Sequence, residues 1–160
     1  MSLVIRSARP GDAPRTLQFV RELASYEHLE HLVVATEVDL DAALFSANPN
    51  VFCEIAEWNG EAVGYALWFL NFSTFRGRNG LYLEDLFVRP GHRGFGIGKA
   101  LLERLARKCL DNGWARLEWA VLDWNAPSIE FYKSRGAEIL PDWRICRVTG
   151  EALQGLAEGR

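Results

Sequence analysis

The order of predicted strands and helices places this chain of 160 residues in the α+β class, with helices flanking a mixed sheet. Apolar and alternating runs predict strands at residues 3–8, 51–58, 62–72, 81–88, 115–122 and 143–148. Apolar residues at helical spacing predict helices at residues 12–29, 36–45, 97–112, 125–134 and 151–157. No linker, repeat or low-complexity tract interrupts this order, so we expect residues 1–160 to form a single domain.

The first two helices are predicted from the residues that begin them. Asp12 follows a Pro-Gly turn and is a preferred N-cap residue, and Pro14 is tolerated in a first helical turn. Thr36 and Asp39 have the spacing of a capping box, which indicates the start of the second helix.

The central strands and the long third helix have equally local signals. Asn59-Gly60 predicts a tight hairpin between the two strands that flank it, and residues 75–80, rich in Arg and Gly, predict a loop. The third helix has an apolar stripe formed by Ile97, Leu101, Leu105 and Cys109. Gly113 is expected to cap its C-terminus.

Composition excludes several classes of function. Hydrophobic residues make up 49% and charged residues 24%, as in an ordinary globular domain. The net charge of −3 offers no basic excess for nucleic acid as the main partner. The N-terminus does not resemble a signal peptide, and no apolar run reaches membrane-spanning length. We therefore expect a cytoplasmic protein with no nucleic-acid or membrane partner.

The cysteines and histidines give no metal-site signal. Cys53, Cys109 and Cys146 are scattered among apolar residues without a C-x-x-C pair, so we expect buried, reduced thiols. His28 and His31 have H-x-x-H spacing, which differs from the i, i+4 pair of zinc proteases. We expect a solvated helix end there and no metal.

A glycine-rich stretch, Arg93-Gly94-Phe95-Gly96-Ile97-Gly98, joins a predicted strand to a helix N-terminus. Such an end offers unpaired N–H groups and a partial positive charge to a phosphate. A P-loop would need Ser or Thr where Ala100 stands, and a dinucleotide-binding loop would follow the first strand of a βαβ unit. Two alternatives remain: the R/Q-x-x-G-x-G/A loop of GNAT acyltransferases, which binds the pyrophosphate of CoA, and a turn without a ligand.

Longer stretches extend this match. The run LYLEDLFVRPGHRGFGIG (81–98) resembles the fourth strand and pyrophosphate loop of the diamine N-acetyltransferases, the spermidine/spermine and thialysine enzymes of the GNAT superfamily. VLDWNAPSIEFYKSRG (121–136) resembles a later stretch of that family, and ELASYE (22–27) resembles its first helix. The resemblance implies the GNAT fold, with a mixed sheet of six or seven strands, acetyl-CoA as co-substrate and a homodimer. Strands 81–88 and 115–122 would then be parallel neighbours that separate to admit pantetheine.

The resemblance also implies roles for individual residues. Tyr132 matches the family's general acid, and Glu84 the acid proposed as base or amine anchor. The implied cofactor-binding residues are Leu86, Phe87, Val88, Arg93, Gly94, Phe95, Gly96, Ile97, Gly98, Lys99, Asn125, Ala126, Pro127, Ser128 and Ser134. The implied substrate-binding residues are Tyr26, Glu27, Glu84, Asp85, Glu118, Trp119, Ala120 and Asp142. The chain departs from the family at Ser134, which replaces an Arg, around Phe75, where a Trp is absent, and at the shortened segment 140–143.

The chemistry expected of these residues is acetyl transfer to an amine. An alkyl ammonium has a pKa of about 10.4, so a site must remove a proton before nitrogen attacks the thioester. Glu84 could accept that proton and Tyr132 could protonate the departing thiolate. Two adjacent strand residues point to opposite faces, so Glu84 and Asp85 enter one cleft only where the strand bulges. Core packing beside Phe131 is the alternative role for Tyr132.

The sequence therefore predicts an acetyl-CoA-dependent N-acetyltransferase acting on a small cationic amine, such as a diamine, a polyamine or a lysine-like compound. Two alternatives stay open: a GNAT enzyme that acetylates a protein N-terminus or Lys, and a non-catalytic sensor that binds acetyl-CoA.

Overall fold

The computed structural model describes residues 1–160. The chain divides into two compact units, residues 1–120 and residues 121–160. The first unit contains one sheet in the order β1-β2-β3-β4-β5. Its strands are β1 (Leu3–Ser7), β2 (Phe52–Trp58), β3 (Glu61–Ser73), β4 (Arg78–Val88) and β5 (Leu117–Glu118). The first four are antiparallel neighbours and β5 is parallel to β4, which confirms the predicted α+β class and mixed sheet.

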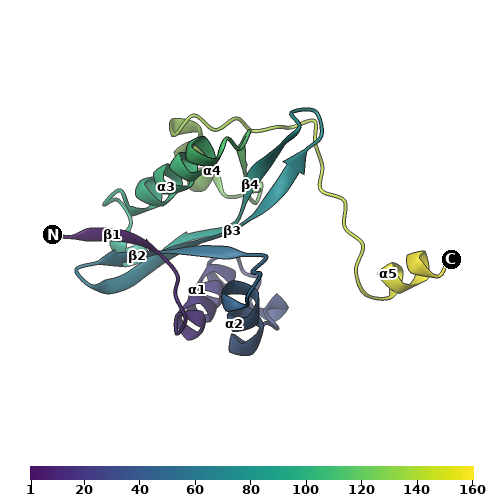
Figure 1. The fold of residues 1–160 in the computed structure, drawn as a ribbon, viewed down its shortest axis with the longest axis horizontal. Coiled ribbons are helices and arrows are strands. Elements are labelled where there is room, and N and C mark those ends of the chain that lie inside the picture. The colour runs from purple at the N-terminus through teal and green to yellow at the C-terminus, as the bar shows by residue number, and fades with distance from the viewer. The chain divides into compact units, whose positions relative to one another are not determined.

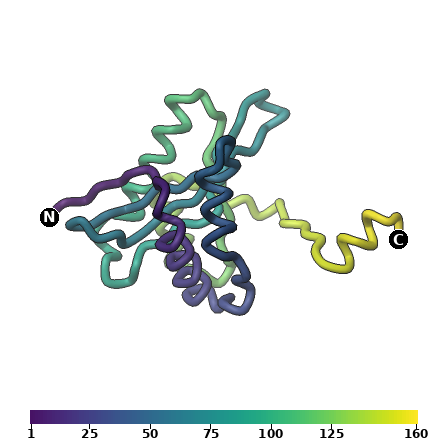
Figure 2. Tube along the Cα trace, turned by 60° about the horizontal axis from the view of Figure 1, so that its bottom comes forward, coloured from purple at the N-terminus to yellow at the C-terminus, as the bar shows by residue number.

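Helices cover both faces of this sheet. Figure 1 shows α1 (Ala13–Tyr26) and α2 (Glu37–Phe45) on one face and α3 (Ile97–Asn112) on the other. In Figure 2, α1 and α2 lie next to each other. Two 3-10 turns, η1 (Glu30–Leu32) and η2 (Pro90–His92), join these elements. No helix has the length and apolar character that crossing a membrane requires.

The main core lies between the sheet and α1. Phe19 of α1 and Tyr65 of β3 are both fully buried, and their rings stack at a centroid distance of 5.4 Å. Ile55 of β2 and Phe87 of β4 belong to the same apolar cluster. This core anchors the central strands and thereby fixes the position of β4.

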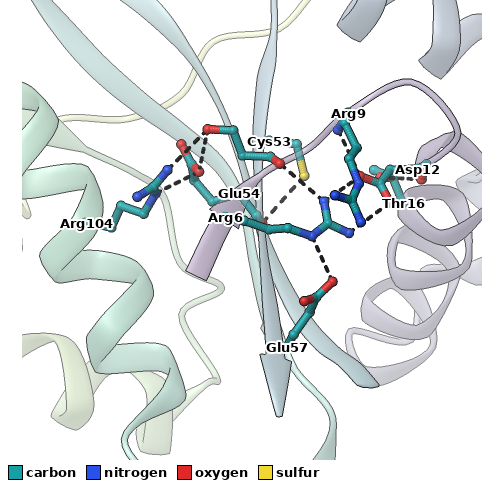
Figure 3. A network of polar contacts seen from close by, with 9 residues as sticks. Arg6, Arg9, Asp12, Thr16, Cys53, Glu54, Glu57 and Arg104 are labelled. Carbon is teal, nitrogen blue, oxygen red and sulfur yellow. Dashed lines mark hydrogen bonds and ion pairs between the residues drawn. The ribbon is translucent and has the colours of Figure 1, made fainter. Parts of the chain in front are cut away.

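The prediction that the Asp12 side chain caps α1 is wrong. Asp12 occupies the N-cap position, but its carboxylate pairs with Arg6 (Nη1 to Oδ2, 2.7 Å) and accepts the backbone N–H of Arg9. Arg6 also bonds Glu57, as Figure 3 shows. The charge-assisted bond with Arg6 replaces the neutral cap and holds the pKa of Asp12 below its usual value, although burial opposes the shift.

Other local predictions are confirmed. Thr36 Oγ1 accepts the N–H of Asp39, and the Asp39 carboxylate accepts the N–H of Thr36, which completes the capping box of α2. Asn59 and Gly60 have φ values of 51° and 84° and form the tight turn between β2 and β3. Gly113 caps α3 with φ of 67°, a left-handed conformation that a glycine adopts without strain.

Several boundaries differ from the predictions. The expected loop at residues 75–80 is shorter, because β4 begins at Arg78, and the helix expected to reach residue 29 ends at Tyr26. His28 has a φ of 59°, a left-handed conformation that a right-handed α-helix cannot contain, so α1 ends before it. Cys53 and Cys109 are buried as expected, whereas Cys146 is exposed.

The sheet has five strands, fewer than the six or seven expected. The strand predicted at 115–122 is reduced to β5, and residues 143–148 form no strand. An alternating sequence becomes a strand only where a neighbour supplies hydrogen bonds, and β5 pairs with β4 over two residue pairs. The second unit contains α4 (Ala126–Ser134) and α5 (Gly150–Ala157), both close to their predicted positions.

Candidate active site

The edge of β4 that faces β5 is open along most of its length. Leu81 pairs with Leu117 and Tyr82 with Glu118, and the ladder ends there. The two strands are therefore parallel neighbours, as predicted, and β4 continues to Val88 without a β5 partner. Backbone groups along this part of β4 can bond an extended ligand in the way that a neighbouring strand would.

A β-bulge lies at the start of this open edge. On β3, Leu67 is opposite Asp85 and Trp68 is opposite Leu83, so Glu84 is the extra residue of β4. The alternation of side chains is broken at this point. Glu84 is exposed, and Asp85 is half-buried on the face of the sheet that packs against α1. This bulge is the irregularity that two adjacent acids of a strand need if both side chains are to reach one cleft.

Asp85 is held by a tyrosine. The hydroxyl of Tyr65 donates a hydrogen bond to Asp85 Oδ2 at 2.9 Å. Burial raises the pKa of the Asp85 carboxyl, with a further rise from the charge of Glu84, while the hydrogen bond from Tyr65 opposes the shift. Glu27, at the C-terminal end of α1, also has a raised pKa, caused by burial and then by the charge of Asp85.

These acids form a negative group with no basic partner inside the first unit. No Lys or Arg of residues 1–120 forms an ion pair with Glu27, Glu84 or Asp85. Glu118 differs, because Arg116 Nε lies 2.9 Å from its carboxylate and Asn71 also donates to it. Of the predicted substrate residues in this unit, Glu27 and Asp85 are brought together, and Glu118 is neutralised by Arg116.

The glycine loop before α3 has the geometry of an anion site. Gly94 and Gly96 have φ values of 84° and 80°, and Gly96 is the N-cap of α3. No side chain caps the helix and no acidic residue lies in its first turn, so its N–H groups face no negative charge from the helix itself. Lys99 extends from the first turn, where it pairs with Glu103 at 3.4 Å. These donors can bind an anionic group such as a phosphate.

Arg93 connects this loop to α1. Its guanidinium lies 4.8 Å from the ring centroid of Tyr26 and 5.6 Å from that of Phe87, and its Nε donates to the carbonyl of Val88 at 2.8 Å. A residue assigned to the cofactor side therefore contacts Tyr26, which was assigned to the substrate side. Arg93 also stabilises the end of β4 through the Val88 carbonyl.

The other predicted site residues of the first unit lie on β4, in the glycine loop and after β5. Phe87 is buried in the core cluster, whereas Leu86 and Val88 are half-buried. Phe95 is exposed and packs on Trp58, with ring centroids 5.4 Å apart. Ile97, the first residue of α3, is buried. Gly98 lies in the first turn of α3, and Trp119 and Ala120 follow directly after β5.

The second unit carries the other predicted site residues. Asn125 caps α4, where its side chain accepts the N–H of Ser128 at 3.4 Å. Ala126 and Pro127 form the first turn of α4, and the hydroxyl of Ser134 at its end donates to the Phe131 carbonyl. Tyr132 lies against Phe131 with ring centroids 5.6 Å apart, and Asp142 is in an exposed turn.

The sequence reasoning missed Tyr65 as a member of the site. The signal was present, because alternation along β3 places Tyr65 and Leu67 on one face, and Leu67 is opposite Asp85. A buried tyrosine needs a partner for its hydroxyl, and an acid on the next strand can supply one.

Comparison with known proteins agrees with this geometry. Residues 17–137 match the Acetyltransferase (GNAT) family. The chain is 41% identical to a thialysine N-epsilon-acetyltransferase of Sus scrofa, over 98% of each protein. It is 32% identical to the L-ornithine N5-acetyltransferase NATA1 of Arabidopsis thaliana, over 95% of this chain and 86% of that protein.

Solved structures give the same result. An integron cassette protein from the mobile metagenome of V. cholerae superposes with a TM-score of 0.82 and 28% identity, over 99% of both chains. The fold and the family inferred from the glycine loop and the LEDLFV strand are confirmed by these matches. The chain belongs to the GNAT family and is an N-acetyltransferase.

Proposed function

We propose that this enzyme transfers the acetyl group of acetyl-CoA to a primary amine of a small cationic substrate, in a ternary complex. The substrate class comprises lysine-like and ornithine-like amino acids, diamines and polyamines. The observation that carries the proposal is the group of acids Glu27, Glu84 and Asp85. Glu84 and Asp85 lie at the bulge of β4, and Glu27 at the end of α1 is close enough to Asp85 for the two charges to interact. No Lys or Arg of the first unit forms an ion pair with them. Such a group attracts a cation.

The roles that we propose for the chain's residues follow from its membership of this family. Acetyl-CoA supplies a thioester activated for acyl transfer. The loop Arg93–Gly98 and Lys99 would hold its pyrophosphate, and backbone groups of Leu86, Phe87 and Val88 would bond the extended part. We also assign cofactor contacts to Asn125, Ala126, Pro127, Ser128 and Ser134.

The acids have two tasks in this proposal. Glu27 and Asp85 bind the ammonium groups of the substrate, and we assign further substrate contacts to Tyr26, Glu118, Trp119, Ala120 and Asp142. Glu84 accepts the proton that the amine must lose before it attacks. The raised pKa of Asp85 makes this carboxylate a second group able to take that proton, because a base with a pKa nearer to neutrality is better matched to the task. Tyr132 protonates the leaving thiolate.

The names of the relatives support the amine class, since thialysine and ornithine both carry a side-chain primary amine. We propose further that residues 1–160 act as one cytoplasmic domain and that the enzyme is a homodimer. The alternating apolar segment 143–148, which forms no strand, supports the dimer, because a second copy could supply the missing ladder partner. Light scattering of the purified chain measures the oligomeric state.

The experiment that tests the substrate class is a thiol-release assay with acetyl-CoA and a panel of amines. The panel contains putrescine, spermidine, lysine, ornithine, thialysine and short peptides with a free N-terminus or Lys. We expect turnover with the small cationic amines. Preference for the peptides would overturn the small-molecule assignment, and cofactor binding without turnover on any amine would indicate a sensor.

A further inference from the structure

A cavity with a volume of about 260 Å³ lies beside the end of β1 and the start of β2. Its wall includes Leu44 and Phe45 at the end of α2, Phe52 and Glu54 of β2, Trp68 of β3 and Lys108 of α3. Lys108 is eleven residues beyond Ile97 on α3, a rise of about 16 Å along the helix. The cavity is therefore separate from the glycine loop.

The first sign of a ligand is a buried donor without an acceptor. Trp68 is 5% exposed and lines the cavity, and its Nε1–H is buried with no hydrogen-bond partner. Indole N–H groups usually find an acceptor when they are buried, because an unpaired donor has lost its bond to water. A ligand oxygen in the cavity would satisfy it.

The second sign is the charge at the same wall. Glu54, which is 1% exposed, receives Arg104 Nε at 2.8 Å and Lys108 Nζ at 3.2 Å. Arg104 alone can neutralise Glu54, so the Lys108 ammonium can also pair with the anionic group of a ligand. Figure 3 shows Arg104 beside Glu54 in the same polar network as Arg6, and Ser7 joins the two groups through its hydroxyl and its carbonyl. The Lys108 ammonium also lies 5.6 Å from the Trp68 ring centroid, so this cation and the unpaired N–H belong to neighbouring side chains.

The rest of the wall is apolar and aromatic. Phe52 and Trp68 stack with ring centroids 4.6 Å apart, and Leu44 and Phe45 close the side formed by α2. A dry apolar cavity of about 150 Å³ is large enough to bind benzene. The present cavity is larger and has room for a ring with a short acidic substituent.

We propose that this cavity binds a small aromatic carboxylate, with the ring against Phe52 and Phe45 and the carboxylate accepting from Trp68 Nε1 and Lys108 Nζ. The ligand satisfies the unpaired indole N–H and pairs with the Lys108 ammonium, and its ring occupies the apolar part of the cavity. The site is distinct from the proposed amine and acetyl-CoA sites and does not depend on them.

The test uses phenylacetate and the neutral phenylacetamide as probes on the full chain. Both are titrated while the indole N–H resonance of Trp68 is followed by NMR, with Trp68→Phe identifying that resonance. We expect phenylacetate to shift it with a Kd on the order of 1 mM, as for a ligand of about ten heavy atoms. The amide should bind about tenfold more weakly, because it lacks the charge that Lys108 pairs with.

Two variants complete the test. Lys108→Gln should weaken phenylacetate about tenfold, whereas Arg107→Gln, which removes the same charge from an exposed position on the same helix, should leave the Kd unchanged. Equal binding of acid and amide, or equal Kd values for the two variants, would overturn the carboxylate assignment. A Trp68 resonance that neither probe moves at millimolar concentration would show that the cavity holds only water.

Discussion

The hydroxyl of Tyr65 lies 2.9 Å from Asp85 Oδ2, and this bond joins two adjacent strands beneath the proposed amine site. Tyr65 is fully buried and stacked on Phe19, so its hydroxyl has a fixed position. The bond favours the ionised form of Asp85, whereas burial disfavours it. Tyr65 is therefore a positioning residue that controls how readily Asp85 gives up its proton.

Removing that hydroxyl should change the pH dependence of the reaction. Tyr65→Phe leaves Asp85 without the bond that lowers its pKa, so the acidic limb of the kcat/KM profile should move to higher pH. Stability should fall by about 1–3 kcal/mol, the typical loss for a hydrogen bond to a charged group. The control is Phe19→Leu, which loosens the same stack and should lower the melting temperature without moving the limb. A limb that stays in place in Tyr65→Phe would mean that Asp85 does not titrate in catalysis.

Asp85 should also make the stability of the enzyme depend on pH. Its pKa is raised in the folded protein, so the folded state holds the proton at pH values where the unfolded chain has lost it. Stability therefore falls as pH rises above the ordinary Asp pKa of about 3.9 and through the raised value. Asp85→Asn removes this loss, so its gain in melting temperature over the natural enzyme should be larger at pH 7 than at pH 4. The exposed Asp41→Asn should show no such difference between the two pH values.

Charge reversal at Glu27 should separate cationic from neutral substrates. Glu27→Lys places a positive charge where the end of α1 approaches Asp85, so KM for a diamine should rise about tenfold or more. KM for an amine without a second charge should rise less. Glu30→Lys makes the same charge reversal at an exposed residue of η1, and as the control it should leave both KM values close to normal. Equal effects of Glu27→Lys on both amines would contradict a role in cation recognition.

The glycine at the start of α3 can be tested against the glycine at its end. Gly96 and Gly113 both have positive φ and open space around the position of an added methyl group. Alanine at either position should cost about 1–2 kcal/mol of stability, since the strain of a left-handed residue is the same. Only Gly96→Ala places a methyl group where a phosphate would approach, so calorimetry should show weaker acetyl-CoA binding for that variant alone. Similar affinities of the two variants would mean that the loop is only a turn.

The sequence predicted those parts of the fold that depend on local chemistry. The capping box at Thr36, the Asn59-Gly60 turn and the glycine cap at Gly113 were all correct, because each is decided by a few neighbouring residues. Asp12 is the N-cap residue of α1 as predicted, but its side chain does not cap the helix because it pairs with Arg6 of β1, and helix-capping rules do not take account of a cation from a strand. The strand predicted at residues 143–148 was wrong, because a strand needs a neighbouring strand to bond and an alternating sequence does not supply one.

The same division applies to the site. The glycine loop and the adjacent acids of β4 stand in continuous motifs and were visible in the sequence. Tyr65 and the contact of Arg93 with Tyr26 were not, because they depend on the register of β3 against β4 and on the packing of α1. The bulge at Glu84 shifts the register of β3 against β4, and no residue type in the sequence predicts a bulge at that position.

The proposed general acid gives the last prediction. If the hydroxyl of Tyr132 protonates the leaving thiolate, Tyr132→Phe removes one oxygen and keeps the ring that lies against Phe131. Turnover should fall by roughly 10²–10⁴, the usual contribution of a positioned general acid.

The lower end of that range is expected, because a thiol with a pKa near 8.5 is already a fair leaving group. Acetyl-CoA affinity and melting temperature should both stay close to those of the natural enzyme, since the glycine loop and the aromatic contact are unchanged. The measurements are kcat, a thermal melt and a cofactor titration on the same preparation, with Phe131→Leu as the control that disturbs the packing and spares the hydroxyl. An unchanged kcat in Tyr132→Phe would make Tyr132 a packing residue, and a kcat lost equally in both variants would assign the effect to the ring contact rather than to proton transfer.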